Sequence, residues 1–147
     1  MKLSKKTRYA FRALVDLASS RDPHTCLATI AERNGISQQF LEHVFAALKR
    51  AEVIKSVKGK QGGYRLGREA SQITAADIVS AIEGDFAFEA EEITPENRNY
   101  EISETIQEQI IDRVNREMRN ILENITLADL VSSYQDKTDF AQGMYYI

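Results

Sequence analysis

A short, glycine-containing turn between two amphipathic segments constrains the fold more than any other feature of the sequence. Residues 27–33 place Ile30 and Ala31 on one face of a helix. Asn34-Gly35 then ends that helix, because glycine suits the left-handed conformation found after a last helical turn. Ser37 is a good N-cap for the next helix, whose apolar residues recur at helical spacing at Leu41, Val44, Phe45 and Leu48. Two amphipathic helices joined by so short a turn predict a helix-turn-helix.

A small hairpin is predicted after the second of these helices. Residues 54–57 are expected to form a strand, the glycine-rich residues 59–63 a turn, and residues 64–66 the returning strand. A hairpin that directly follows a helix-turn-helix is the usual form of a wing. The sequence therefore predicts a winged helix-turn-helix.

Two further helices frame this unit. A helical pattern begins at Ser4 and stops before Pro23, since proline disfavours helix in the residue that precedes it. Thr74 to Asp77 resembles a capping box with Asp in place of Glu, and the helix that it opens ends at Gly84. The expected fold is mainly α with one small β-hairpin, and residues 1–84 are predicted to be a winged helix-turn-helix DNA-binding domain.

The longest periodic segment follows an acidic, weakly patterned stretch at 85–99, which we interpret as a loop or linker. Apolar residues then recur at steps of three or four, at Ile102, Ile106, Ile110, Val114, Met118, Ile121 and Ile125. The start of this helix is open, because Thr94-Pro95 and Ser103 are both good openings. A helix from Ser103 to Asn124 would be about 33 Å long. Thr126 is expected to cap a last short helix, and residues 134–147 to form a tail. The carboxy-terminal part thus spans residues 100–147.

The long amphipathic helix must bury its apolar stripe. The first domain can cover part of it, and the rest most simply packs against a second copy of the chain, which gives a two-fold homodimer. The residues expected at that dimer interface are Ile106, Ile110, Val114, Met118 and Ile121. The alternative is that the stripe packs on the first domain of the same chain.

The net charge of −3 hides a strong division along the chain. Residues 1–68 contain 14 Lys and Arg against 5 Asp and Glu, a net charge of +9, whereas residues 69–147 contain 5 against 17, a net charge of −12. A compact basic half favours a polyanion such as double-stranded DNA through counterion release. The acidic half should be repelled by the same polyanion. The alternative is that the division only serves solubility.

In a helix-turn-helix the second helix enters the major groove and turns its N-terminal residues toward base edges. The candidates for this reading are Ser37, Gln38, Gln39, Glu42 and His43. Glutamine can bond an adenine edge twice, and glutamate can accept from cytosine. The basic turn of the wing suits the minor groove through Lys58, Lys60 and Gln61. Phosphate contacts are expected from basic residues at the start of the chain: Lys2, Lys5, Arg8 and Arg12. Taken singly, each of these residues could also be a solvated surface residue.

Other classes of protein find little support in the sequence. Both histidines are isolated and no base accompanies Cys26, so we expect no enzyme and no catalytic residues. One cysteine cannot form an internal disulfide, and no Cys/His cluster predicts a metal site. Apolar runs are far shorter than the ~20 residues of a membrane span, and a secretory signal pattern is lacking. We therefore expect a cytoplasmic protein without a membrane partner.

Cys26 lies just before the second helix of the chain and allows two interpretations. It is either a small buried core residue or a redox-sensitive thiol, because the N-terminus of a helix lowers the pKa of a thiol.

Three segments of the chain resemble the Rrf-two family of bacterial winged-helix transcription regulators. They read MKLSKKTRYAFRALVDLA, ISQQFLEHVFAALKRAEVIKSVKGKQGGYRL and ITAADIVSAIEG. The resemblance is close over residues 1–84 and loose over the remainder. It implies a dimer held by the long helix. It also implies recognition-helix contacts at Ser37, Gln38, Gln39, Glu42 and His43, and wing contacts at Lys58 and its neighbours.

One departure points to the cluster-free, CymR-like branch of that family. Cluster-binding members carry three cysteines in the loop before the long helix, because iron–sulfur clusters need thiolate ligands. Residues 85–99 contain no cysteine, so no iron–sulfur cluster or other cofactor is expected. The resemblance implies a repressor of genes for cysteine and sulfur acquisition, linked to the enzyme cysteine synthase.

The last residues of the sequence, Tyr145, Tyr146 and Ile147, fit a carboxy-terminus that cysteine synthase recognises. A regulatory protein that acts mainly by binding this enzyme through its tail is the alternative function. The same residues could instead pack on their own dimer.

Overall fold

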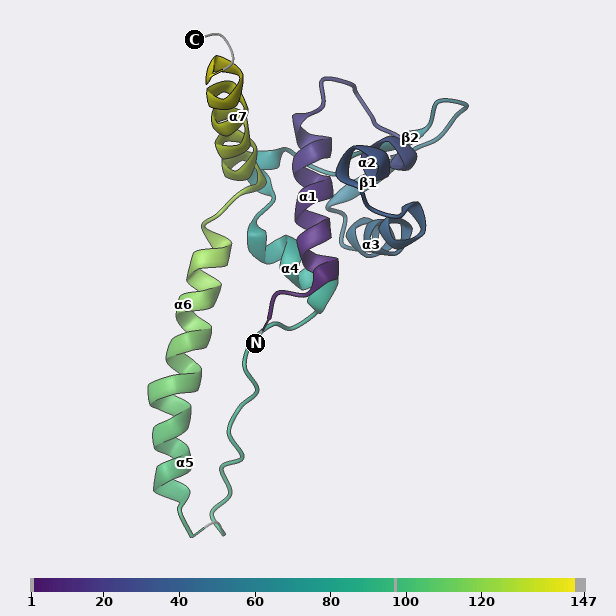
Figure 1. Ribbon diagram of the computed structural model, residues 1–147. Coiled ribbons are helices and arrows are strands. Elements are labelled where there is room, and N and C mark those ends of the chain that lie inside the picture. The colour runs from purple at the N-terminus through teal and green to yellow at the C-terminus, as the bar shows by residue number, and fades with distance from the viewer. Residues whose placement is uncertain (1, 97, 145–147) are drawn as a thin grey trace.

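Three helices surround the apolar core that the sequence pattern predicts. In the computed structural model, which describes residues 2–96 and 98–144, these helices are α1 (Lys5–Ser19), α2 (Leu27–Asn34) and α3 (Gln38–Arg50) (Figure 1). Ser37 caps α3 by accepting a hydrogen bond from the backbone N–H of Phe40, and Gly35 ends α2 at φ 61°. Leu14 and Phe45 are fully buried between the helices. The expected helix-turn-helix is confirmed.

The hairpin consists of β1 (Ile54–Val57) and β2 (Gly63–Leu66), paired antiparallel with Ile54 opposite Leu66. The loop between α1 and α2 pairs with β2 through an antiparallel bridge between Thr25 and Tyr64. The Thr25 N–H donates to the Tyr64 carbonyl at 3.0 Å, and the Tyr64 N–H donates back to Thr25 at 2.8 Å. The predicted wing is therefore present, and the loop before α2 is bonded to it.

Helix α4 (Ala75–Glu83) follows the short 3₁₀ turn η1 (Ala70–Gln72). The predicted capping box is formed: Thr74 accepts from the Asp77 N–H at 3.1 Å, and Asp77 accepts from the Thr74 N–H at 2.9 Å. Arg68 pairs with the same Asp77 carboxylate at 2.9 Å. The end of the wing is thus joined to the start of α4.

A continuous helical rod follows, made of α5 (Tyr100–Ile106), the π-helical turn η2 (Gln107–Ile111) and α6 (Asp112–Glu123). It points away from the winged domain (Figure 1). The rod begins at Tyr100, between the two candidate starts at Thr94-Pro95 and Ser103. The wide π turn was not predicted, because the apolar spacing alone does not separate it from an α-helix.

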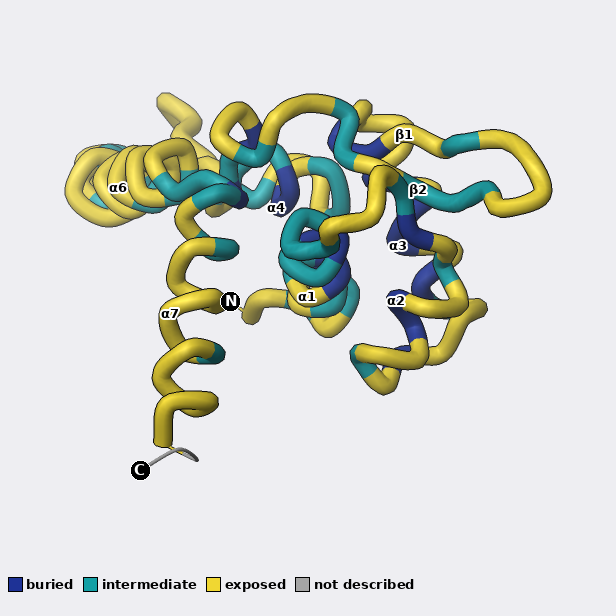
Figure 2. Tube along the Cα trace, turned by 90° about the horizontal axis from the view of Figure 1, so that it is seen from above, coloured by how far each residue is buried: buried dark blue, intermediate teal, exposed yellow. Residues whose placement is uncertain are grey.

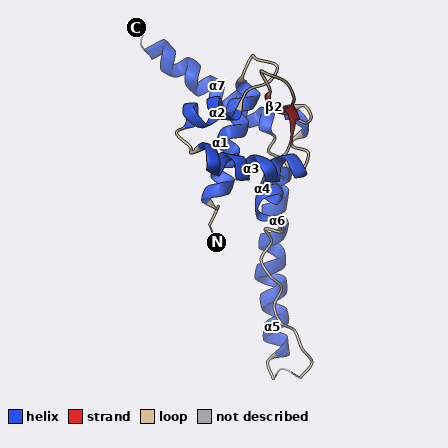
Figure 3. Ribbon diagram, turned by 90° about the vertical axis from the view of Figure 1, so that its right-hand side faces the viewer, coloured by secondary structure: helices blue, strands red, loops and turns tan. Residues whose placement is uncertain are grey.

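The stretch before the rod is held along it rather than acting as a free linker, as Figure 3 shows. The Asn115 amide accepts from the Phe88 N–H at 2.8 Å and donates to the Phe88 carbonyl at 3.1 Å. The Gln107 side-chain carbonyl accepts from the Glu91 N–H at 2.7 Å. We call residues 85–96 the strap.

Helix α7 (Leu127–Met144) corrects the expectation of a short last helix followed by a tail from residue 134. The helix continues because no proline interrupts it and Gly143, its only glycine, lies at its end. Most of α7 is exposed and extends outward (Figure 2). The predicted tail residues Tyr145, Tyr146 and Ile147 lie outside the described residues. No described helix is both long and apolar enough to cross a membrane.

The corner between α6 and α7 is bonded back to the winged domain. The Ala75 N–H donates to the Ile125 carbonyl, and the Leu127 N–H donates to the Ile73 carbonyl, both at 2.8 Å. Ile73 and Leu127 are fully buried. The rod and α7 are therefore fixed to the domain at this corner.

Gly63→Ala should lower the free energy of unfolding by about 1–3 kcal/mol, the usual cost of overpacking. A Cβ at this position would meet the Thr25 carbonyl oxygen at 2.5 Å and the Cys26 nitrogen at 2.8 Å, and neither backbone atom can move freely. Urea denaturation measures the change. Gly143→Ala is the matched control, because its Cβ would meet nothing within 4 Å. Equal stability of the two variants would contradict the close approach.

Candidate nucleic-acid interface

One face of α3 is buried, and the opposite, polar face is exposed to solvent. Leu41, Val44, Phe45 and Leu48 are fully buried. The predicted reading residues are all exposed: Ser37, Gln38, Gln39, Glu42 and His43. The structure therefore brings this set together at the start and along the outer face of one helix. Their contacts with bases stay a prediction.

An aromatic contact places the basic face of α1 beside the start of α3. The Tyr9 and Phe40 rings meet edge to face with centroids 5.5 Å apart. The Lys5 ammonium lies 5.4 Å and the Arg12 guanidinium 5.6 Å from the centroid of the Tyr9 ring. Arg8 is exposed on the same helix. Cations from α1 therefore flank the N-terminal end of the candidate reading helix.

A second aromatic contact fixes the wing on the other side of α3. Phe45 and Tyr64 meet edge to face at 4.9 Å. The wing tip extends beyond the hairpin (Figure 2), with Lys58, Lys60 and Gln61 exposed. The carbonyl of Gln61 contacts the ring of His24. Sequence reasoning treated His24 as isolated, and no spacing in the sequence points to this contact.

The candidate phosphate-binding cations are not engaged in ion pairs within the described residues. There the ion pairs are Arg33–Asp16 at 2.5 Å and Arg68–Asp77 at 2.9 Å. Both join elements of the winged domain to one another. Lys5, Arg8 and Lys58 can therefore contact phosphate without first breaking an ion pair.

A buried threonine anchors the start of α1 to the end of α4. The Thr7 hydroxyl donates to Glu83 Oε1 at 2.5 Å, and Thr7 is fully buried. Hydrogen bonds from the side chain of Ser4 and then from Thr7 hold the pKa of Glu83 below its ordinary value. The position of Lys5, next in sequence to Ser4, is thereby coupled to α4.

The long rod presents two apolar faces rather than one stripe. Ile110, Val114 and Ile121 lie on its outer side and are 55%, 37% and 56% exposed. Ile106 and Met118, also predicted for the dimer interface, are half-buried. Met118 lines both a cleft toward the winged domain and, with Val114 and Ile121, a shallow groove along the rod. The predicted interface residues thus differ in exposure, and Met118 lies where the two faces meet.

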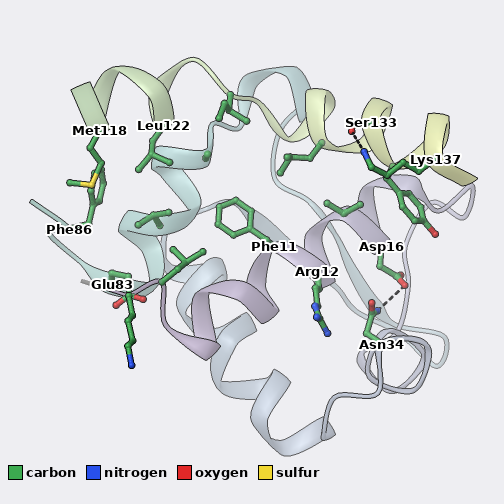
Figure 4. A pocket seen from close by; sticks show the side chains of 18 of the residues that line it. Phe11, Arg12, Asp16, Asn34, Glu83, Phe86, Met118, Leu122, Ser133 and Lys137 are labelled. Atoms are coloured by element: carbon green, nitrogen blue, oxygen red, sulfur yellow. Dashed lines mark hydrogen bonds between the residues drawn. The ribbon is translucent and has the colours of Figure 1, made fainter. Parts of the chain in front are cut away.

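That cleft of about 940 Å³ lies between α1, α4, α6 and α7. Phe11, Phe86, Met118 and Leu122 contribute to its apolar lining (Figure 4). Lys2 lies in its lining rather than on the outer face of α3, so the structure does not group Lys2 with the reading residues.

Cys26 is exposed and precedes α2 as its N-cap residue, so the interpretation as a buried core residue is wrong. Its Sγ lies 2.9 Å from the Thr29 hydroxyl. Hydrogen bonds from the Thr29 side chain and then from the Thr29 backbone lower the pKa of the Cys26 thiol. A redox role for this thiol stays a prediction.

The fold, the bare polar face of α3 and the basic groups on either side of it define a winged-helix DNA-binding transcription regulator. The model of the Rrf2 family, described as an iron-dependent transcriptional regulator, matches residues 3–133. The chain belongs to the Rrf2 family.

Characterised relatives agree with this assignment. The HTH-type transcriptional regulator CymR of Bacillus subtilis (strain 168) is 34% identical over 148 residues, which covers both chains completely. IscR of Yersinia pestis is 35% identical over 138 residues, covering 90% of this chain and 80% of that protein. The chain is thus a transcription regulator and not an enzyme.

Solved structures show the same fold. The structure of CymR (YrzC), the global cysteine regulator of B. subtilis, matches with a TM-score of 0.74 at 32% identity, covering 90% of this chain and 98% of that one. IscR of T. potens matches with a TM-score of 0.72 at 32% identity, covering 93% and 90%. The expected winged-helix fold class is therefore confirmed.

The alkylation rate of Cys26 should reach half its maximum at a lower pH than that of a free cysteine. The thiolate is the reactive form, and a lowered pKa preserves it at lower pH. Thr29→Val removes the side-chain hydrogen bond and should move the midpoint back up. Iodoacetamide labelling across a pH series measures both midpoints. Identical midpoints for the two proteins would contradict the role of Thr29.

Proposed function

We propose that the protein is a homodimeric repressor that reads a two-fold DNA operator. Helix α3 lies in the major groove, and the wing tip lies in the adjacent minor groove. The observation that carries this proposal is the bare face of α3, flanked by the cations of α1 and of the wing. A bound dimer represses by occupying promoter DNA.

The division of charge supports the direction of docking. The basic half of the sequence holds α1, α3 and the wing, whereas the acidic half holds the strap, the rod and α7. Cations that neutralise phosphates release counterions and supply most of the sequence-independent affinity. The polar side chains of α3 would then add the discrimination between bases.

The outer face of the rod supports a second copy of this chain as its partner. Ile110, Val114 and Ile121 form an exposed apolar row. Arg113 and Glu117, of opposite charge, line a shallow groove along the same row. A surface that carries both charges beside an apolar row can complement itself when two helices run antiparallel about a two-fold axis. Such a dimer would present two α3 helices to half-sites ~34–36 Å apart, or a multiple of this.

We further propose that the regulator works without an iron–sulfur cluster. Cluster iron is held by thiolates, and the strap offers carboxylates, backbone groups and no cysteine. Cys26 lies just before α2 in the winged domain, whereas the strap runs alongside the rod (Figure 1). The residues present do not fit a cluster.

The similarity to CymR over the whole length supports genes of cysteine and sulfur metabolism as targets, and a site of action in the cytoplasm. The alternative function through cysteine synthase concerns residues 145–147, which lie outside the described residues, and stays a prediction.

Gln39→Ala and Lys58→Ala should affect DNA binding in different ways. The first should lose about 1–3 kcal/mol of discrimination at one base position, because a base-edge contact is removed. The second should weaken specific and random duplexes alike and reduce the salt slope of binding by about one. Titration of specific, mutated and random duplexes at several salt concentrations measures both effects. If both variants bind every duplex like the unmodified protein, α3 and the wing do not read DNA.

Val114→Glu should convert the dimer to a monomer, because it places two charges in an interface from which water is excluded. The measurement is sedimentation equilibrium over a concentration series. Arg116→Glu is the control, since the helical repeat puts residue 116 on the opposite side of the rod from residue 114. A dimer that persists in Val114→Glu would place the contact elsewhere, with the cleft as the next candidate.

A further inference from the structure

The wing tip, residues 58–62, lies beyond the hydrogen-bonded strands of the hairpin. The β-ladder ends at the pair Val57–Gly63, and beyond it the Gly62 N–H donates to the Gly59 carbonyl at 3.1 Å. Glycine loses more backbone freedom on folding than any other residue. A tip that contains two glycines would therefore not hold its lysines in one place unaided.

The loop between α1 and α2 supplies a contact from outside the hairpin. Thr25 exchanges two backbone hydrogen bonds with Tyr64, which sets this loop alongside β2. One residue earlier, Nε2 of His24 contacts the carbonyl oxygen of Gln61 in the tip. A carbonyl oxygen can only accept, so Nε2 carries the proton and donates it.

The close packing beside this contact explains why the loop can lie so near the tip. Gly63 has no side chain, and a Cβ there would meet the Thr25 carbonyl oxygen at 2.5 Å. The loop backbone therefore lies directly against β2. His24 is half-buried at this point, whereas Lys58 and Lys60 remain exposed.

We infer that His24 is a positioning residue for DNA binding. Its imidazole N–H holds the backbone of the wing tip at Gln61. Lys58 and Lys60 are therefore already positioned for DNA before binding. His24 itself does not touch the duplex. Fixing a flexible segment before association spares the entropy that would otherwise be lost on binding. This inference rests on the proposed contact between the wing and DNA.

The first test compares binding to the specific duplex at one salt concentration and one pH. His24→Ala should weaken binding about three- to tenfold, the range expected for one net hydrogen bond. His24→Gln keeps an amide N–H that can donate to the same carbonyl and should recover most of the loss. In a Lys58→Ala/Lys60→Ala background, His24→Ala should cause no further loss, because the positioned groups are gone.

The second test needs no DNA. Amide hydrogen exchange in the free protein should become faster in residues 58–62 of His24→Ala and stay unchanged in α3. Asp22→Asn, an exposed position in the same loop, should change neither segment.

Two outcomes overturn the role of His24 while leaving the proposed function intact. One is an equal loss of affinity in both backgrounds, and the other is no loss when the lysines are present. If Lys58→Ala/Lys60→Ala itself binds DNA normally, the wing contact of the proposed function is wrong, and the role of His24 in binding falls with it.

Discussion

The candidate nucleic-acid interface depends on the fixed orientation of α3 in the winged domain. The apolar side chains of α3 are fully buried in the core of the winged domain, so the helix cannot rotate without exposing them to water. Two aromatic residues of this helix also make edge-to-face contacts with different neighbouring elements. Phe40 meets Tyr9 of α1, and Phe45 meets Tyr64 of the wing. Such contacts are worth about 0.5–1.5 kcal/mol beyond burial and prefer a defined angle. The basic groups of α1 and of the wing are thereby placed relative to the bare face of α3.

Features set by neighbouring residues could be predicted from the sequence. The turn at Gly35, the cap at Ser37 and the capping box of Thr74 and Asp77 follow from local backbone chemistry, and all are present. Features set by distant residues could not. His24 and Gln61 are 37 positions apart, and nothing in the pattern joins them. Cys26 looked like a core residue because cysteine is among the most buried residue types, yet its place before α2 leaves it exposed.

The apolar stripe of the rod predicted a helix but not the surfaces that its residues form. A spacing of three or four residues predicts a helix but spreads its members over a wide arc. The π turn at Gln107–Ile111 changes the phase of the residues that follow it. Met118 lines the cleft and also a groove with Ile121, whereas Ile110 is exposed. The apolar stripe therefore contributes to two surfaces, one toward the chain's own domain and one that is exposed.

The strap has an electrostatic consequence for docking. Two side-chain amides, Asn115 and Gln107, bond its backbone at Phe88 and Glu91. The backbone of the strap thus lies along the rod, away from the wing (Figure 3), and most of its acidic residues are exposed. Charges in solution are screened within about 8 Å at physiological ionic strength, so a free acidic linker could approach the lysines of the wing and compete with phosphate. Because the strap is bonded in place, its carboxylates do not compete with phosphate for the lysines of the wing. The proposed docking through α3 and the wing also keeps the acidic half of the chain away from DNA.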